Sequence, residues 1–182
     1  MKINKTTMIG SLGLALMLSS GALLAAEEGQ RGQLSSKDYK FASDATIGGM
    51  QEVQLGELAR QKAGNQSVRE FGERMVTDHQ KANDELKQIV QKKGALLPTS
   101  VSHHETSTLE HLQKLSGAEF DKAYVSDMVR DHKKDVKEFE KASQSLSDPD
   151  LKAFAEKTLP TLQEHLRMVQ GLEEQVKGEA KR

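Results

Sequence analysis

Histidines suited to metal binding or proton transfer occur in a repeated pentapeptide of this 182-residue chain. The stretch MVTDH ends at His79, and the stretch MVRDH ends at His132, 53 residues further on. Histidine is otherwise scarce, with 6 in the whole chain. A neutral imidazole is a common metal ligand, and a nearby carboxylate can hold its ring in one orientation. The repeat raises the question of whether the two histidines meet in the folded chain.

Each of four predicted helices carries one ionisable residue on its inward-facing line of apolar side chains. The apolar residues recur at steps of three and four, the spacing of a single helix face. The four lines are interrupted by Glu52, His79, His132 and His165. Counting from the predicted helix ends places all four near mid-helix and level to within about one turn. The sequence thus predicts a polar layer of one glutamate and three histidines inside the core.

Two arrangements would satisfy such a layer, since buried carboxylates and imidazoles need partners. In the first, Glu52 and the three histidines bind one divalent transition metal, which could be Zn, Cu, Fe or Mn. This arrangement predicts a role in metal handling or envelope stress. In the second, the same residues form a hydrogen-bonded network without metal. The protein is then a non-enzymatic structural or interaction protein.

The aspartates of the repeat, Asp78 and Asp131, cannot share the inward direction of the histidines. Adjacent residues on a helix are rotated by about 100°. Each aspartate is therefore predicted either to reach around and orient a neighbouring imidazole, or to pair on the surface with Lys81 or Lys134.

A second group of candidate ligands lies between the second and third helices. It comprises His103, His104, Glu105 and His111. If this segment is helical, His104 and His111 lie two turns apart on one face, which would allow a weak surface metal site. The alternative is a solvated connection with incidental histidines.

The sequence lacks the motifs of several enzyme classes. No glutamate stands three residues before a histidine, so the Glu-x-x-His pairs of di-iron bundles are missing. There is no phosphate-binding glycine-rich loop, no serine elbow and no cysteine. The formal charge of -1 does not favour a nucleic-acid partner. No nucleotide or nucleic-acid function is therefore expected. The missing motifs favour a non-enzymatic protein over an enzyme, and redox or oxygen chemistry at a bound metal is left open.

The elements that carry these residues are predicted to be long helices. Gly64 and Gly94 suit helix ends, Ser67 with Glu70 and Ser116 with Glu119 have the spacing of capping boxes, and Asp148 precedes Pro149 as an N-cap. The predicted helices span residues 36–64, 67–94, 116–147 and 148–178. Glycines 48 and 49 are expected to weaken the first helix, and Pro160 to kink the last.

Short links join the first two helices and the last two, which predicts two antiparallel hairpins. The longer segment between them, with a short helix at about residues 105–115, could return the chain along the bundle as a crossover. We therefore predict an all-α, ferritin-like four-helix bundle over residues 36–178. A simple up-down-up-down bundle is the alternative.

The N-terminus has the pattern of an export signal. Lys2 and Lys5 precede an apolar run that ends near Ala26, so residues 1–26 are predicted to be a signal peptide directing the chain to the periplasm or cell envelope. An uncleaved membrane anchor is the alternative. Residues 27–35 are predicted to be a flexible leader, and residues 179–182 a tail.

Three segments in order resemble a known protein family. They begin FASDATIGGMQEVQLGELARQ, LSGAEFDKAYVSDMVRDHKKD and DPDLKAFAEKTLPTLQEHL. Together they span about residues 38–174 and are similar to the exported bacterial proteins of domain-of-unknown-function family 4142 (DUF4142). The resemblance implies a ferritin-like four-helix fold and a periplasmic or outer-membrane location. Its recurrent positions map onto Glu52, the two Asp-His pairs and His165, but it supplies no activity.

Overall fold

The computed structural model describes residue 29, residues 31–101 and residues 107–179. This part of the chain is almost entirely helical and contains no strands, which confirms the predicted all-α class. Its helices are α2 (Ser36–Lys62), α3 (Gln66–Lys92), α4 (Ser107–Gln113), α5 (Gly117–Ser145) and α6 (Pro149–Glu179). The predicted signal peptide and the last three residues lie outside the described residues. None of the described helices is both long and apolar enough to cross a membrane.

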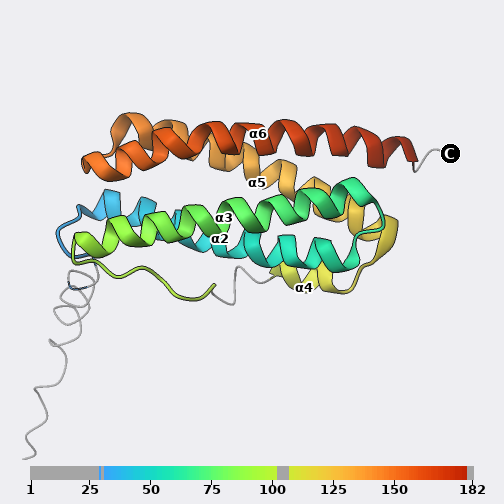
Figure 1. Cartoon of the computed structure of the whole chain (residues 1–182), viewed down its shortest axis with the longest axis horizontal. Helices are drawn as coiled ribbons and strands as arrows, with labels where there is room; N and C mark the ends of the chain where they lie inside the picture. The colour runs from blue at the N-terminus through green and yellow to red at the C-terminus, as the bar shows by residue number, and fades with distance from the viewer. Residues whose placement is uncertain (1–28, 30, 102–106, 180–182) are drawn as a thin grey trace, which may run out of the picture.

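The four long helices form two antiparallel hairpins (Figure 1). Helix α2 packs chiefly on α3, and α5 chiefly on α6. Less extensive contacts of α3 with α6 and of α2 with α5 join the hairpins. The segment after α3 returns along the bundle to α4, so α3 and α5 run in the same direction (Figure 1). This is the predicted crossover topology, and the up-down-up-down alternative is wrong.

The first hairpin is closely packed because two glycines face each other. A Cβ atom added at Gly56 would lie 2.6 Å from the carbonyl oxygen of Gly72. One added at Gly72 would lie 2.7 Å from the Cβ atom of Ala59. The two backbones therefore meet without intervening side chains, a contact that only glycine permits at this distance.

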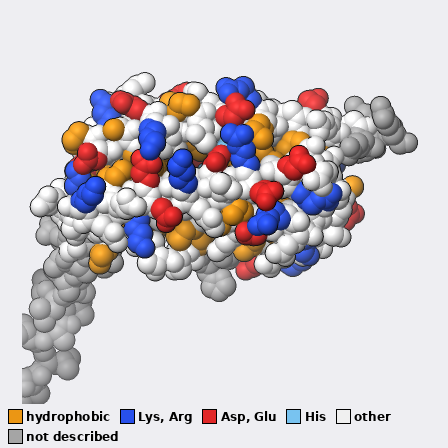
Figure 2. Space-filling view, in the orientation of Figure 1, with side chains coloured by type: hydrophobic (Ala, Val, Ile, Leu, Met, Phe, Trp, Pro, Cys, Tyr) orange, Lys and Arg blue, Asp and Glu red, His pale blue; other side chains and the backbone are white. Residues whose placement is uncertain are grey.

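The apolar core is divided into two clusters by the polar layer. One cluster, around Phe71, Phe120 and Met128, fills the end of the bundle where α2 meets α3. The other, around Leu86 and Phe154, fills the opposite end. In each long helix the ionisable residue of the inward line falls between the two clusters. Charged residues of both signs are interspersed on the face of the molecule seen in Figure 2.

Two buried aspartates tie the hairpins together in a reciprocal way. The carboxylate of Asp121, near the start of α5, accepts hydrogen bonds from the backbone N–H groups of Gly64 (3.0 Å) and Asn65 (2.8 Å), in the turn between α2 and α3. The carboxylate of Asp38, in the first turn of α2, accepts one from the N–H group of Ser147 (2.9 Å), between α5 and α6. The first helix of each hairpin thus anchors the turn of the other hairpin.

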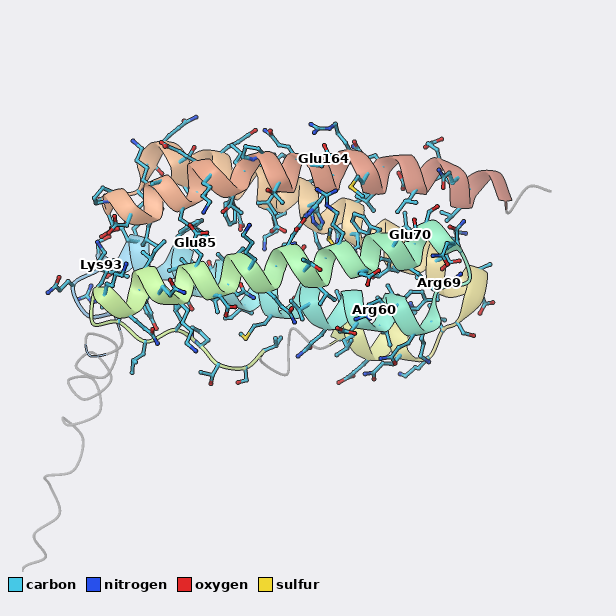
Figure 3. All side chains as sticks on the ribbon, in the orientation of Figure 1. Arg60, Arg69, Glu70, Glu85, Lys93 and Glu164 are labelled. Carbon is cyan, nitrogen blue, oxygen red and sulfur yellow. The ribbon has the colours of Figure 1, made fainter. Side chains whose placement is uncertain are left out.

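Side chains on the surface reinforce both ends of the bundle (Figure 3). Arg69 donates hydrogen bonds to the carbonyl oxygens of Ala63 and Gly64, which closes the first turn. At the other end, Lys93 pairs with Asp148 (2.9 Å) and Asp150 (2.6 Å), which links the end of α3 to the start of α6.

Several predicted helix ends differ from the observed ones. Helix α3 begins earlier than predicted because the side chain of Asn65, rather than that of Ser67, caps it. Ser116 occupies the N-cap of α5 but makes no side-chain capping bond. Asp148 caps α6 as predicted, by accepting from the N–H groups of Asp150 and Leu151. Gly64 does not cap α2, because Ala63 ends that helix in an extended conformation.

Two further sequence expectations are modified. The described part of the predicted flexible leader is packed: Leu34 is buried, and the N–H group of Gln33 donates to the carbonyl oxygen of Lys93 (3.0 Å). Helix α6 continues through Pro160, whose ring is exposed, and α2 continues through both glycines at 48 and 49.

We expect Asp121→Ala to lower the free energy of unfolding by about 1–3 kcal/mol, because two backbone N–H groups would lose their acceptor. Asp44→Ala, which removes only an exposed ion pair with Lys40 (2.6 Å), should change it by less than about 0.5 kcal/mol. Urea denaturation of both variants measures the difference. Equal, small effects would contradict an anchoring role for Asp121.

Candidate metal centre

Three histidines from three helices converge in the middle of the core. His79 on α3, His132 on α5 and His165 on α6 are 7%, 0% and 0% exposed. Their ring centroids are 5.4 to 5.9 Å apart. One potential ligand nitrogen from each lies within 4.8 Å of the others. The counting argument from the sequence therefore placed the three histidines at the correct level.

Each imidazole uses one ring nitrogen for a hydrogen bond that fixes its orientation. Nδ1 of His79 lies 2.9 Å from Oε2 of Glu52. Nε2 of His165 lies 2.8 Å from Oδ2 of Asp78. Nδ1 of His132 lies 3.1 Å from the carbonyl oxygen of Met128, one turn earlier on α5. Metal-binding histidines usually donate their second N–H group to partners of these two kinds.

The remaining ring nitrogens are buried, and no described residue forms a hydrogen bond with them. They are Nε2 of His79, Nε2 of His132 and Nδ1 of His165. Most buried polar atoms in proteins are hydrogen-bonded, and an unpaired one costs about 1–3 kcal/mol. Three such nitrogens therefore lie at one level without a partner among the described residues. A divalent metal ion would satisfy all three at once.

Glu52 lies beside the histidines and bonds to one of them. Its Oε2 atom contacts His79, while its Oε1 atom is 3.5 Å from Nδ1 of His132 and has no hydrogen-bond partner. The structure thus brings together all four residues singled out from the sequence. The carboxylate, however, lies beside the Nδ1 atoms of His79 and His132, whereas the unpaired atoms of these two rings are the Nε2 atoms.

The two aspartates of the repeat have different surroundings. Asp78 bonds to His165 and also pairs with Arg74 (3.2 Å). Asp131 pairs with Arg130 (3.2 Å), the residue before it, and within the described part of the chain no hydrogen bond joins it to an imidazole. Of the surface lysines considered as partners, Lys134 pairs instead with Glu138. The orienting role predicted for both aspartates is thus supported by contacts only at Asp78.

Burial and neighbouring charges alter the protonation of this layer. Burial alone would raise the pKa of Glu52, but the imidazoles of His79 and His132 outweigh it and bring the pKa to about 2. Burial lowers the pKa of His79, yet the carboxylate of Glu52 reverses this and raises it. Burial lowers the pKa of His132, and it lowers that of His165 to about 4 despite the hydrogen bond that His165 donates to Asp78. His132 and His165 are therefore neutral near pH 7, the form that binds metals.

Aromatic side chains close the site on the side of the first apolar cluster. The ring of Phe71 packs against His132 (6.2 Å between centroids) and His165 (6.4 Å). It also packs edge-on against Tyr124 (6.3 Å), whose hydroxyl group is buried without a partner. Apolar walls of this kind keep water from a site.

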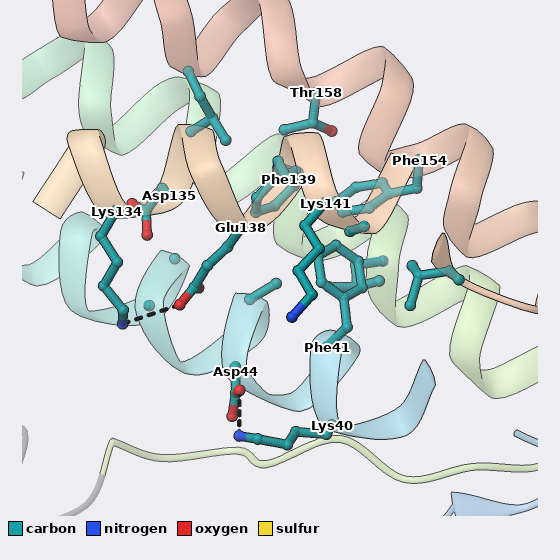
Figure 4. Close-up of a pocket in the computed structure, with 18 of the residues that line it drawn as sticks. Lys40, Phe41, Asp44, Lys134, Asp135, Glu138, Phe139, Lys141, Phe154 and Thr158 are labelled. Carbon is teal, nitrogen blue, oxygen red and sulfur yellow. Dashed lines mark hydrogen bonds and ion pairs between the residues drawn. The ribbon is translucent and has the colours of Figure 1, made fainter. Parts of the chain in front are cut away.

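A cavity of about 240 Å³ reaches the site from the other side (Figure 4). It lies between α2 and α5, with Glu52, His79 and Asp135 among its polar lining residues. Burial and the nearby charge of Glu52 raise the pKa of Asp135 to about 9, so this carboxyl group is uncharged near pH 7. Sequence analysis missed Asp135, whose only signal was its position one turn after Asp131 on the same helix.

The second predicted cluster is not assembled among the described residues. His103, His104 and Glu105 lie outside them. His111 is exposed on α4. The core histidines are therefore the metal-competent group that the described part of the chain contains.

Comparison with known proteins places the fold but gives no activity. A sequence model described as domain of unknown function (DUF4142) matches residues 23–172. A crystal structure of a DUF305 fragment from Deinococcus radiodurans superposes with a TM-score of 0.69 at 12% identity, covering 78% of this chain and 98% of that one. The crystal structure of a DUF305 protein from Streptomyces coelicolor superposes with a TM-score of 0.66 at 15% identity. The match covers 77% of this chain and 93% of that one. No curated protein matches the chain.

We expect the metal-free protein to lose stability as the pH falls from 6.5 toward 4. The pKa of His165 is about 4 when folded and 6.5 when free, so the unfolded chain takes up the proton first. At about 1.4 kcal/mol per pH unit, this titration alone removes up to about 3 kcal/mol. Urea denaturation in a chelator should show a smaller pH dependence for His165→Leu, and an unchanged one for the exposed control His111→Leu. Identical pH profiles for all three proteins would contradict this account.

Proposed function

Because the chain belongs to the DUF4142 family, whose members are defined without a function, we propose from its geometry that it binds one divalent transition-metal ion. His79, His132 and His165 would be the protein ligands. The observation that supports this most directly is the set of three buried, unpaired ring nitrogens at one level of the core. We further propose that the protein handles metal in the periplasm or cell envelope, for which the N-terminal sequence pattern is the support.

The pattern of hydrogen bonds supports the same assignment. Each histidine is held by a partner of its own: the carboxylate of Glu52, the carboxylate of Asp78 or a backbone carbonyl group. These bonds fix both the tautomer and the ring direction before any ion arrives, which lowers the cost of assembling the site. Glu52 is assigned this orienting role, in place of the direct ligation that spacing alone predicts, because its Oε2 atom already bonds to His79.

Three imidazoles also limit which ions fit. Neutral nitrogen ligands suit Zn, Cu and Fe, and the nearby carboxylate offsets part of the ionic charge, which would also admit Mn. A three-histidine set leaves at least one coordination position for water or another small ligand. Such an open position suits an ion that is exchanged, as metal handling requires, better than a closed structural site. No residue of the site is assigned a catalytic role.

We expect protein purified without chelator, or reloaded with Zn²⁺, to hold about one ion per chain by elemental analysis. Loading should raise the free energy of unfolding by about 2.7 kcal/mol when free metal is 100 times the Kd. The double variant His79→Ala/His132→Ala should lose both effects, and His111→Ala should keep them. Metal-free protein whose melting does not respond to Zn²⁺, Cu²⁺ or Fe²⁺ would refute the site and leave the polar layer with a structural role.

The two aspartates of the repeat provide a matched pair of variants. Asp78→Asn should weaken metal binding about 10- to 100-fold, since loss of a partner that orients a ligand typically costs this much. Asp131→Asn, the same change in the same motif, should leave the affinity nearly unchanged, because Asp131 contacts Arg130. Metal titration calorimetry compares them. Equal losses of affinity in both variants would show that the hydrogen bond that His165 donates to Asp78 does not determine metal affinity.

A further inference from the structure

The cavity between α2 and α5 has an aromatic wall at one end. The rings of Phe41 and Phe139 meet edge-on (5.1 Å between centroids), and Phe139 also contacts Phe154 (6.1 Å). Figure 4 shows these three rings gathered at one end of the pocket, with Asp135 toward the other end. The described residues therefore provide an apolar chamber beside the metal-competent layer, and its volume of about 240 Å³ suits a ligand smaller than a typical drug.

A glycine inside α2 enlarges this cavity. Gly48 lines it, and no heavy atom lies within 4 Å of the position that an added Cβ would occupy. Glycine inside a helix costs about 1 kcal/mol relative to alanine. At the neighbouring Gly49 a Cβ would lie 2.4 Å from the side chain of Asn83, so packing explains that glycine. Close packing does not explain Gly48, and the empty space beside it is part of the cavity.

The exposed rim of the cavity carries an excess of positive charge. Lys37, Lys40, Lys134 and Lys141 line it with Asp44 and Glu138. Lys40 pairs with Asp44 (2.6 Å) and Lys134 with Glu138 (3.7 Å), as the dashed lines in Figure 4 show. Within the described part of the chain, neither Lys37 nor Lys141 forms an ion pair; Lys37 donates to the carbonyl oxygen of Ser145 (2.5 Å). The rim therefore offers two uncompensated cations to a ligand.

We propose that this cavity binds a medium-chain carboxylic acid, with its alkyl chain among Phe41, Phe139 and Phe154 and its carboxylate at Lys37 and Lys141. Burial of the chain supplies the affinity, and the lysines select the head group. Inside the cavity the competing charges are already engaged: Glu52 bonds to His79, and Asp135 is uncharged near neutral pH. The cavity borders the histidine layer at Glu52 and His79. The proposed contacts are made by the phenylalanines and lysines, none of which is a proposed metal ligand, so the proposal does not depend on the metal.

Three probes with the same chain and different head groups test the proposal: octanoate, 1-octanol and octylamine. Calorimetric titration of the full chain, with backbone amide NMR to locate the bound probe, should show octanoate binding at least about tenfold more tightly than octylamine. The affinity for 1-octanol should lie between those for octanoate and octylamine. Octylamine binding as tightly as octanoate, or no binding of octanoate, would overturn the proposal.

Variants matched in chemistry identify the place of binding. Gly48→Leu should abolish octanoate binding by occupying the cavity, without destabilising the helix. Gly171→Leu makes the same change in α6, where the added side chain also meets open space, and should bind octanoate normally. Lys141→Glu should weaken the binding of octanoate at least about threefold. Lys133→Glu, on the same helix but outside the rim, should leave octanoate binding unchanged. Normal binding by Gly48→Leu would overturn the assignment to this cavity.

Octanoate titrations in chelator and in the presence of Zn²⁺ distinguish a failure of the cavity proposal from a failure of the metal proposal. Octanoate should bind in both conditions, even if Zn²⁺ does not bind at all. Conversely, Zn²⁺ binding with no response to octanoate overturns the cavity ligand alone.

Discussion

Both nitrogens of an imidazole buried in a helical core need a partner, and this requirement determines how the side chains are arranged in the middle of the bundle. Three such rings occupy one level between two apolar clusters, where water cannot freely compensate for a missing bond. One nitrogen of each is satisfied by a carboxylate or a backbone carbonyl group, and the other is not. Apolar residues at these positions would pack without any such penalty. A core with three histidines at these positions therefore has less stability than an apolar core of the same shape.

The level of the histidines depends on how the two hairpins are held in register. Within a hairpin, close contact between Gly56 and Gly72 sets the distance between α2 and α3. Between hairpins, contacts are less extensive, and Asp38 and Asp121 bind the opposite turns at the two ends of the bundle. A slip of either hairpin by one turn would break these bonds. It would also move His79 about 5 Å away from the level of His132 and His165.

The sequence was sufficient to predict the layer because helical spacing determines the face and height of each residue. Caps and apolar periodicity placed Glu52 and the three histidines at one level, and the long connection after α3 correctly indicated the crossover. Spacing does not determine side-chain rotamers, so the different surroundings of Asp78 and Asp131 could not be separated. Nor does it determine the gap between α2 and α5, so the cavity was missed. The roles of Asp38 and Asp121 were not predicted because an acidic residue near the N-terminal end is favourable on any helix.

The division of ligands between the hairpins has a mechanical consequence. His79 belongs to the first hairpin, whereas His132 and His165 belong to the second. An ion held by all three would cross-link halves of the chain whose mutual contacts are sparse compared with those inside each half. Such a cross-link resists separation of the hairpins most strongly at mid-length, far from the aspartates that fasten the ends. The two hairpins would then separate as rigid units only when no ion is bound. A bound ion would limit how far they can move apart.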